Sequence, residues 1–91
     1  MRKIVHSSRF KKDFKKLIRS GRFNLKNFKF VVDQIASDIE LPKKYADHKL
    51  GGDLSAFREC HLEPDLLLVY SIEDNDLMLF LFRIGSHSEI F

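Results

Sequence analysis

Apolar residues recur with a helical period in the first half of the chain. Over residues 9–20 they fall at positions i, i+4, i+7 and i+8, and a second stripe with the same period covers residues 25–39. This spacing places the apolar side chains on one face of an amphipathic helix. The first half therefore predicts two helices, each with one face that must be buried.

The ends of both helices are marked by capping and turn residues. Ser7 or Ser8 can cap the first helix through its hydroxyl, and Asn24 can cap the second through its amide oxygen. Gly21 is predicted to end the first helix, because glycine adopts the left-handed conformation common after a helix. The second helix is predicted to end at Leu41-Pro42, since the residue before a proline disfavours helical geometry.

The apolar pattern changes near Tyr45. Residues 66–72 and 77–84 are apolar runs of strand length, separated by a polar turn at residues 73–76. Two such runs across a short turn predict a central hairpin that is buried on both faces or nearly so. Shorter strands are predicted at residues 2–6, 48–50 and 57–62.

These elements predict an α+β fold in the order β-α-α-β-β-β-β. The two N-terminal helices pack on a small, mostly antiparallel sheet, because each apolar face needs an apolar partner. A chain of 91 residues has room for one hydrophobic core. We therefore expect a single domain spanning residues 1–91.

Charge is distributed unevenly along the chain, whose net charge is +3. Residues 1–44 carry 13 Lys and Arg against 4 Asp and Glu, whereas residues 45–91 carry 3 against 9. A strongly cationic half favours a polyanionic partner such as RNA, and a merely solvated basic face is the alternative. The lysines on the polar side of the first predicted helix are Lys11, Lys12, Lys15 and Lys16.

The sequence carries few signals for export or redox chemistry. No apolar run approaches the roughly 20 residues of a membrane span, and residues 1–6 lack the apolar region of a signal peptide. The single cysteine, Cys60, cannot form an internal disulfide, which fits a reducing compartment. Because Cys60 and His61 are neighbours on a strand, their side chains point to opposite faces and cannot pair. We expect a cytoplasmic protein, without membrane contact, in which Cys60 is a small core residue.

Three of the four histidines and one aspartate fall at predicted strand ends or loops. Imidazoles titrate near neutrality, so two of them in different environments can act as base and acid in one step. RNA supplies its own nucleophile, the ribose 2′-OH, so its cleavage requires no metal and no other cofactor. A set of surface or structural imidazoles is the alternative. The candidate residues are His48, His61, Asp65 and His87.

Three cations and one aromatic residue are candidates for holding RNA. Lys49, Arg58 and Arg83 can stabilise charge that develops on a phosphate, although each can equally be a surface charge. Phe91 can stack on a base or cap the core. A zinc site built from three histidines and Asp65 has suitable ligands but no metal-binding spacing, so no metal is expected.

Three segments carry a resemblance to a known family: residues 45–50 (YADHKL), 57–70 (FRECHLEPDLLLVY) and 83–91 (RIGSHSEIF). Together they resemble the YafQ-type branch of the RelE/ParE toxin superfamily over nearly the whole chain, although the two helices match only in layout. The resemblance implies a RelE-like fold. It also implies the toxin of a type II toxin-antitoxin pair, an endoribonuclease that enters the ribosomal A site and cuts messenger RNA without metal.

The resemblance also implies roles for single residues and partners. It assigns catalysis to the set His48, His61, Asp65 and His87, assigns the hold on the message to Phe91, and implies an antitoxin that wraps the toxin. We expect His87 to be the general acid, His48 or Asp65 the base, and His61 to orient or stabilise the phosphate. We expect the toxin alone to be monomeric.

The alternative function is a non-catalytic module that binds RNA or a partner protein through its basic helices. It includes a gyrase inhibitor of the ParE type, although related ParE toxins lack this histidine set.

Overall fold

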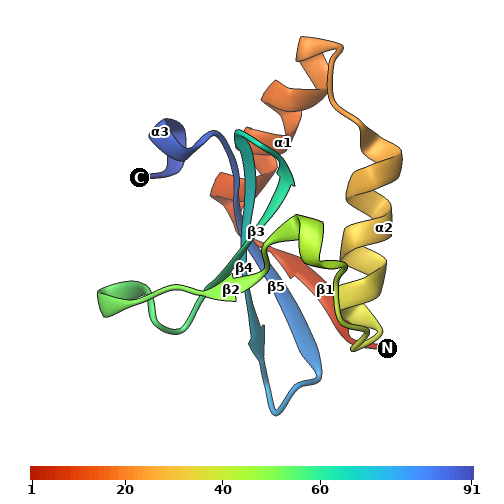
Figure 1. Cartoon of the computed structure of the whole chain (residues 1–91), viewed down its shortest axis with the longest axis vertical. Coiled ribbons are helices and arrows are strands. Elements are labelled where there is room, and N and C mark those ends of the chain that lie inside the picture. The colour runs from red at the N-terminus through yellow and green to blue at the C-terminus, as the bar shows by residue number, and fades with distance from the viewer.

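A five-stranded sheet forms the centre of the protein (Figure 1). The computed structural model describes all 91 residues. The helices α1 (Ser8–Ser20) and α2 (Leu25–Ala36) lie together on one side of the sheet. The short helix α3 (His87–Ile90) and the loop after the second strand project on the other side. We refer to the face of the sheet opposite α1 and α2 as the open face.

The strands follow the order β1-β5-β4-β3-β2. β4 (Leu66–Glu73) is central, between β5 (Met78–Gly85) and β3 (Arg58–Glu63), and the edges are β1 (Lys3–His6) and the two-residue β2 (His48–Lys49). β1 runs parallel to β5, and every other neighbouring pair is antiparallel. The predicted α+β architecture and its order are confirmed, with α3 as an additional element.

Two single-turn 3-10 helices complete the fold. η1 (Lys43–Tyr45) leads into β2, and η2 (Gly52–Leu54) lies in the loop between β2 and β3. None of the helices is long and apolar enough to cross a membrane.

The predicted caps position both long helices. The hydroxyl of Ser7 accepts a hydrogen bond from the backbone N–H of Phe10 at 2.9 Å, and the side-chain oxygen of Asn24 accepts one from Asn27 at 3.0 Å. Gly21 follows α1 with a φ of 71°, in the left-handed region that glycine adopts without strain. Local capping chemistry therefore fixes where each helix begins.

The predicted end of the second helix was wrong. α2 ends at Ala36, well before Leu41-Pro42, and Asp38 adopts a left-handed φ of 58°. Ile39 continues the apolar period of the helix, yet it is 52% exposed. Asp tolerates the left-handed region better than most residues, so the chain turns here and the last apolar position leaves the helix.

The hydrophobic core lies between the helices and the sheet. Phe14 and Phe28 pack with ring centroids 5.1 Å apart, within a group of helix-side phenylalanines that includes Phe10 and Phe23. Cys60 is fully buried in this core, as predicted, and burial raises the pKa of its thiol. The strand residues in the core are Cys60, Leu62, Leu68, Tyr70, Leu79, Leu81 and Ile84.

The central hairpin contains an irregular pairing. Val69 pairs with Arg83 and Tyr70 pairs with Leu81, so Phe82 has no partner on β4. A bulge of this kind bends its strand and changes the direction of a side chain. It allows β5 to direct Leu81 and Ile84 into the core and Phe82 onto the open face.

Candidate active site on the open sheet face

Two neighbouring strands place three titratable side chains on the open face. Cys60 and Leu62 point into the core, so Glu59 and His61 point the other way, because side chains alternate along a strand. His48 pairs with Glu59 across β2 and β3 and lies on the same face. We call His48, Glu59 and His61 the imidazole cluster.

Glu59 lies between the two imidazoles. Its Oε1 is 3.2 Å from Nε2 of His61 and 4.0 Å from Nε2 of His48, and the two rings are 6.3 Å apart between centroids. The Glu59 residue is only 8% exposed, whereas the side chains of His48 and His61 are 50% and 35% exposed. Glu59 therefore holds a shielded carboxylate oxygen beside two accessible imidazoles.

The tautomer of His48 follows from its backbone contact. Nδ1 lies 2.6 Å from the carbonyl oxygen of Ala46, and a carbonyl oxygen only accepts hydrogen bonds. Nδ1 therefore carries the hydrogen, and a neutral His48 has a free electron pair on Nε2. That nitrogen faces Glu59 and can accept a proton.

Sequence reasoning missed Glu59. The available signal was its spacing, because a residue two positions before His61 on a predicted strand lies on the same face. Its proximity to His48 depends on the register between β2 and β3, which required the structure.

The other predicted site residues form a second group, at the end of the sheet where α3 begins. Oδ1 of Asp65, in the turn between β3 and β4, accepts a hydrogen bond from the backbone N–H of His87 at 3.4 Å. The rings of His87 and Phe91 are 5.2 Å apart between centroids. Asp65 therefore contacts the backbone of His87 and holds the start of α3 against the turn. We call Asp65, His87 and Phe91 the C-terminal cluster.

Glu89 attaches α3 to the rest of the domain. Its Oε2 accepts a hydrogen bond from Nζ of Lys16 on α1 at 2.7 Å, and its Oε1 accepts one from the backbone N–H of Ser86 at 2.9 Å. The bond from Lys16, followed by the bonds from Ser86, lowers the pKa of Glu89 to about 2. The same pair raises the pKa of Lys16.

The three predicted phosphate-binding cations are not brought together. Arg83 donates to Asp13 of α1 through Nε at 2.8 Å and Nη2 at 3.2 Å, and both side chains are 13% exposed. Arg58 donates to Asp47 at 3.2 Å, on the face of β3 that also carries Cys60. Lys49 pairs with Arg58 and shares that face, away from His48. Their roles in holding RNA stay predictions.

The lysines of α1 form an exposed basic surface. All four predicted positions are exposed, and Lys16 also reaches Glu89 of α3. This contact brings the basic surface next to the C-terminal cluster. The exposed lysines are Lys11, Lys12, Lys15 and Lys16.

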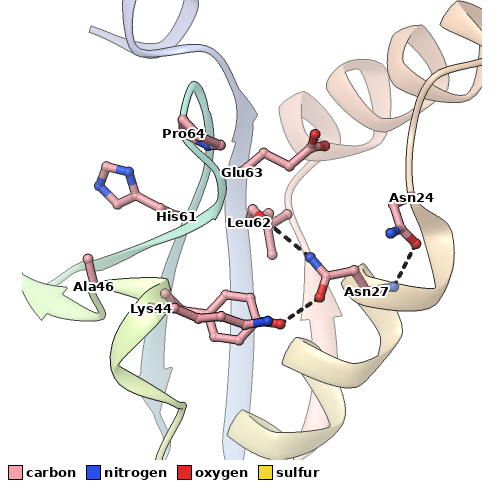
Figure 2. A pocket seen from close by; sticks show the side chains of 9 residues that line it. Asn24, Asn27, Lys44, Ala46, His61, Leu62, Glu63 and Pro64 are labelled. Atoms are coloured by element: carbon pink, nitrogen blue, oxygen red, sulfur yellow. Dashed lines mark hydrogen bonds between the residues drawn. The ribbon is translucent and has the colours of Figure 1, made fainter.

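A polar cavity of about 530 Å³ lies beside His61, between β3 and the start of α2 (Figure 2). Asn27 crosses from α2: its Nδ2 donates to the carbonyl of Leu62 at 3.2 Å, and its Oδ1 accepts from the hydroxyl of Tyr45 at 2.6 Å. In Figure 2 the imidazole of His61 points away from α2. Asn27 thus fixes the end of β3, and with it the position of His61.

Although His48, Glu59 and His61 lie close together, no three His, Cys, Asp or Glu side chains are placed so that together they could hold a metal ion. The placement of these side chains does not test the expected metal-free chemistry, which stays a prediction.

The fold and the site together define a small basic α+β domain that presents imidazoles and carboxylates on an open sheet face. Residues 2–91 match the family described as the bacterial toxin of type II toxin-antitoxin system, YafQ. The chain belongs to this family.

Relatives and solved structures resemble the chain over its full length. The mRNA interferase toxin YafQ of Escherichia coli K12 is 31% identical over 91 residues, which cover 99% of this chain and 96% of that protein. A metal-bound toxin from Helicobacter pylori is 52% identical, with a TM-score of 0.93 and full coverage of both chains. YafQ in the DinJ-YafQ complex of E. coli is 32% identical, with a TM-score of 0.84 and coverage of 100% and 99%. The expected family and fold are confirmed.

Proposed function

We propose that this toxin is an endoribonuclease that cleaves messenger RNA on the ribosome. The observation that carries the proposal is the carboxylate of Glu59 between the imidazoles of His48 and His61, on an open sheet face. The name of the E. coli relative, an mRNA interferase, supports the same substrate. The basic surface of α1 suits a ribonucleoprotein target, because exposed lysines bind phosphates by releasing counterions.

The proposed reaction uses the ribose as its nucleophile. A base removes the proton from the 2′-OH, and O2′ attacks the adjacent phosphorus. The bond between phosphorus and O5′ breaks, and an acid gives O5′ a proton. The products are a 2′,3′-cyclic phosphate and a 5′-hydroxyl. RNA supplies the nucleophile and the leaving group, and side chains supply the base and the acid. Each proton transfer of this kind typically raises the reaction rate by about 10²- to 10⁴-fold.

The geometry refines the expected roles. Nε2 of His48 is the base we propose, because its Nδ1 hydrogen is committed to Ala46 and Glu59 stabilises the imidazolium that forms. His61 stabilises the phosphate, paired with Glu59 at 3.2 Å. His87 remains the proposed general acid, and Asp65 positions it through its backbone contact.

The test compares single alanine variants in cleavage of ribosome-bound message. His87→Ala and His48→Ala are expected to lower the single-turnover rate by about 10²-fold or more while the far-UV circular dichroism stays unchanged. His6→Ala is the matched control, because His6 is an exposed imidazole on β1, outside both clusters. Cleavage at the wild-type rate by His87→Ala and His48→Ala would contradict the proposal.

A cognate antitoxin is the second proposed partner. E. coli YafQ forms a complex with DinJ, and the 32% identity over the whole chain supports a similar pairing here. Co-expression of the neighbouring small gene and co-purification on a tagged toxin test this pairing. The toxin alone is proposed to be monomeric, which sedimentation measures directly.

The alternative is a non-catalytic module, and the exposed lysines of α1 favour it. In that case neutralising the lysines abolishes growth arrest, whereas alanine at His48, His61 and His87 leaves arrest intact. The ribonuclease proposal expects the histidine variants to lose toxicity. The lysines to be neutralised are Lys11, Lys12, Lys15 and Lys16.

A metal requirement is tested separately. We propose that toxin treated with excess chelator, and then dialysed free of it before it meets the ribosomes, keeps its cleavage rate, because acid-base cleavage of RNA by imidazoles needs no ion. Loss of activity in the treated toxin that is restored by preincubating it with one metal would contradict this.

A further inference from the structure

A second group of aromatic residues lies on the open face, apart from the core. Phe57, Phe80 and Phe82 are each partly buried, yet none belongs to the hydrophobic core or packs against it. The rings of Phe57 and Phe82 stack with centroids 4.5 Å apart and planes at 26°, and Phe80 lies 6.3 Å from Phe82. We call these three residues the phenylalanine platform.

The platform bridges the central strand. Phe57 directly precedes β3 and Phe82 lies on β5, and β4 separates these strands in the sheet. The stacked rings must therefore meet above β4. This explains why Val69 and Ser71, which face the open side of β4, are only 1% and 2% exposed. The bulge that leaves Phe82 unpaired directs its ring across β4 toward Phe57.

The platform is continuous with the imidazole cluster. Phe57 and Glu59 are two residues apart on one face of the same segment, which separates their Cα atoms by about 7 Å. A nucleotide whose ribose and phosphate lie against Glu59 and His61 therefore has its own base, or that of its neighbour, within reach of the rings.

The exposed area of the platform fits a small planar ligand. A phenylalanine side chain has about 150–250 Å² of surface to bury, so three that are mostly buried expose together on the order of 100 Å². A stable protein partner needs about 800 Å² on each side. Aliphatic side chains would also shield β4 from water, so shielding alone does not require stacked rings. A nucleobase matches the small exposed area of the platform and can stack on the faces of its rings.

We propose that the phenylalanine platform stacks a nucleobase of the single-stranded RNA whose sugar and phosphate lie against the imidazole cluster. The proposal rests on the ribonuclease function above. Stacking on exposed rings is a common way for sheets to hold single-stranded RNA, and it tolerates any base because every base has a π-face. The platform thus contributes to holding the message and takes no part in proton transfer.

The test measures stacking without cleavage. A message with 2-aminopurine beside a 2′-O-methyl nucleotide is bound to a programmed ribosome and titrated with full-length toxin. The methyl group blocks the nucleophile, and stacking on a ring quenches the fluorescence of 2-aminopurine. Phe57→Leu and Phe82→Leu keep an apolar cover over β4 but remove a π-face. Phe82→Tyr keeps the ring, and Phe30→Leu is the control, because Phe30 is 43% exposed on α2.

The expected result separates the variants into two groups. Phe57→Leu and Phe82→Leu lose the quenching, and their half-saturating toxin concentration rises about 5- to 150-fold, which corresponds to one lost stacking contact. Phe82→Tyr and Phe30→Leu behave as wild type. Circular dichroism confirms that each variant is folded.

Three outcomes would overturn the proposal: wild-type toxin that gives no quenching, leucine variants that quench as wild type does, or leucine variants that lose only antitoxin binding or self-association. Failure of the ribonuclease proposal would be seen in a different measurement, because wild-type toxin would then leave the unmethylated message uncut. The quenching of 2-aminopurine would still show whether a base stacks on the platform.

Discussion

The two faces of the sheet use the same strands but different side chains. On the face covered by α1 and α2, Leu68 and Leu79 are fully buried among aliphatic residues and helix phenylalanines. On the open face, β3 presents Glu59 and His61, which are titratable. Alternation along a strand allows β3 to supply both layers at once. The covered face therefore carries most of the stability, and the open face is free to hold reactive groups.

The largest expected effect comes from the open face. Glu59→Gln keeps the shape of the side chain but removes the negative charge beside the imidazoles of His48 and His61. We expect the single-turnover cleavage rate to fall by about 10²-fold or more, since the proposed base, His48, loses its carboxylate partner. We also expect the free energy of unfolding, from urea titration, to change by less than about 1 kcal/mol.

Glu63→Gln is the matched control for Glu59→Gln, because Glu63 is an exposed glutamate at the end of the same strand. If the two variants cleaved message at equal rates, Glu59 would have no part in the proposed chemistry.

The covered face gives the next largest effect. Leu68→Ala leaves a cavity at a fully buried position, so the free energy of unfolding should fall by about 2–5 kcal/mol. Leu77→Ala, at a residue that is 65% exposed, should change it by less than about 0.5 kcal/mol. Urea denaturation followed by circular dichroism measures both. If the two variants were equally stable, the covered face would not be the main source of stability.

A smaller effect is expected where α1 meets β5. Asp13→Ala removes the acceptor of two hydrogen bonds from Arg83 and one from the backbone N–H of Ile84. Losing hydrogen bonds to a charged group in a shielded position should cost about 1–3 kcal/mol of unfolding free energy. Asp33→Ala, at an exposed aspartate of α2, is the control. A change no larger than that of Asp33→Ala would show that the ion pair adds little.

The smallest expected effect is a pH dependence of the contact between α3 and α1. Bonds from Lys16 and Ser86 lower the pKa of Glu89 from its ordinary value of 4.5 to about 2. The contact is therefore complete above pH 4.5 and is lost as the pH falls toward 2. NMR shifts of His87 and Phe91 should follow this transition in the wild type. Glu89→Gln should lack it, and an identical acid transition in that variant would assign the change to another group.

Much of the fold was predictable from local chemistry. Capping by Ser7 and Asn24, the helical stripes and the two long apolar runs each depend on residues close together in the sequence. The end of α2 was not predictable, because Ile39 continues the apolar period while Asp38 turns the chain. Helix α3 has a single turn, which is too short to show a period.

The candidate site was predictable in kind but not in grouping. Strand ends identified the histidines, yet pairing of His48 with Glu59 depends on a register between segments eleven residues apart. The partner of Arg83 was hidden for the same reason, since Asp13 lies 70 positions away along the chain. Contacts of this kind come from the packing of elements, and no local pattern encodes them.

The parallel pairing of β1 with β5 has a consequence for biosynthesis. Residues Lys3 to His6 leave the ribosome early, but their partners, Met78 to Leu81, are made 75 residues later. The sheet cannot close before β5 has been translated, and such distant pairing makes folding slow. The contacts of Asp13 with Arg83 and of Lys16 with Glu89 likewise cannot form until the end of the chain has been translated. A nascent chain of this toxin therefore stays unfinished, with His87 not yet docked, until nearly all of it has been synthesised.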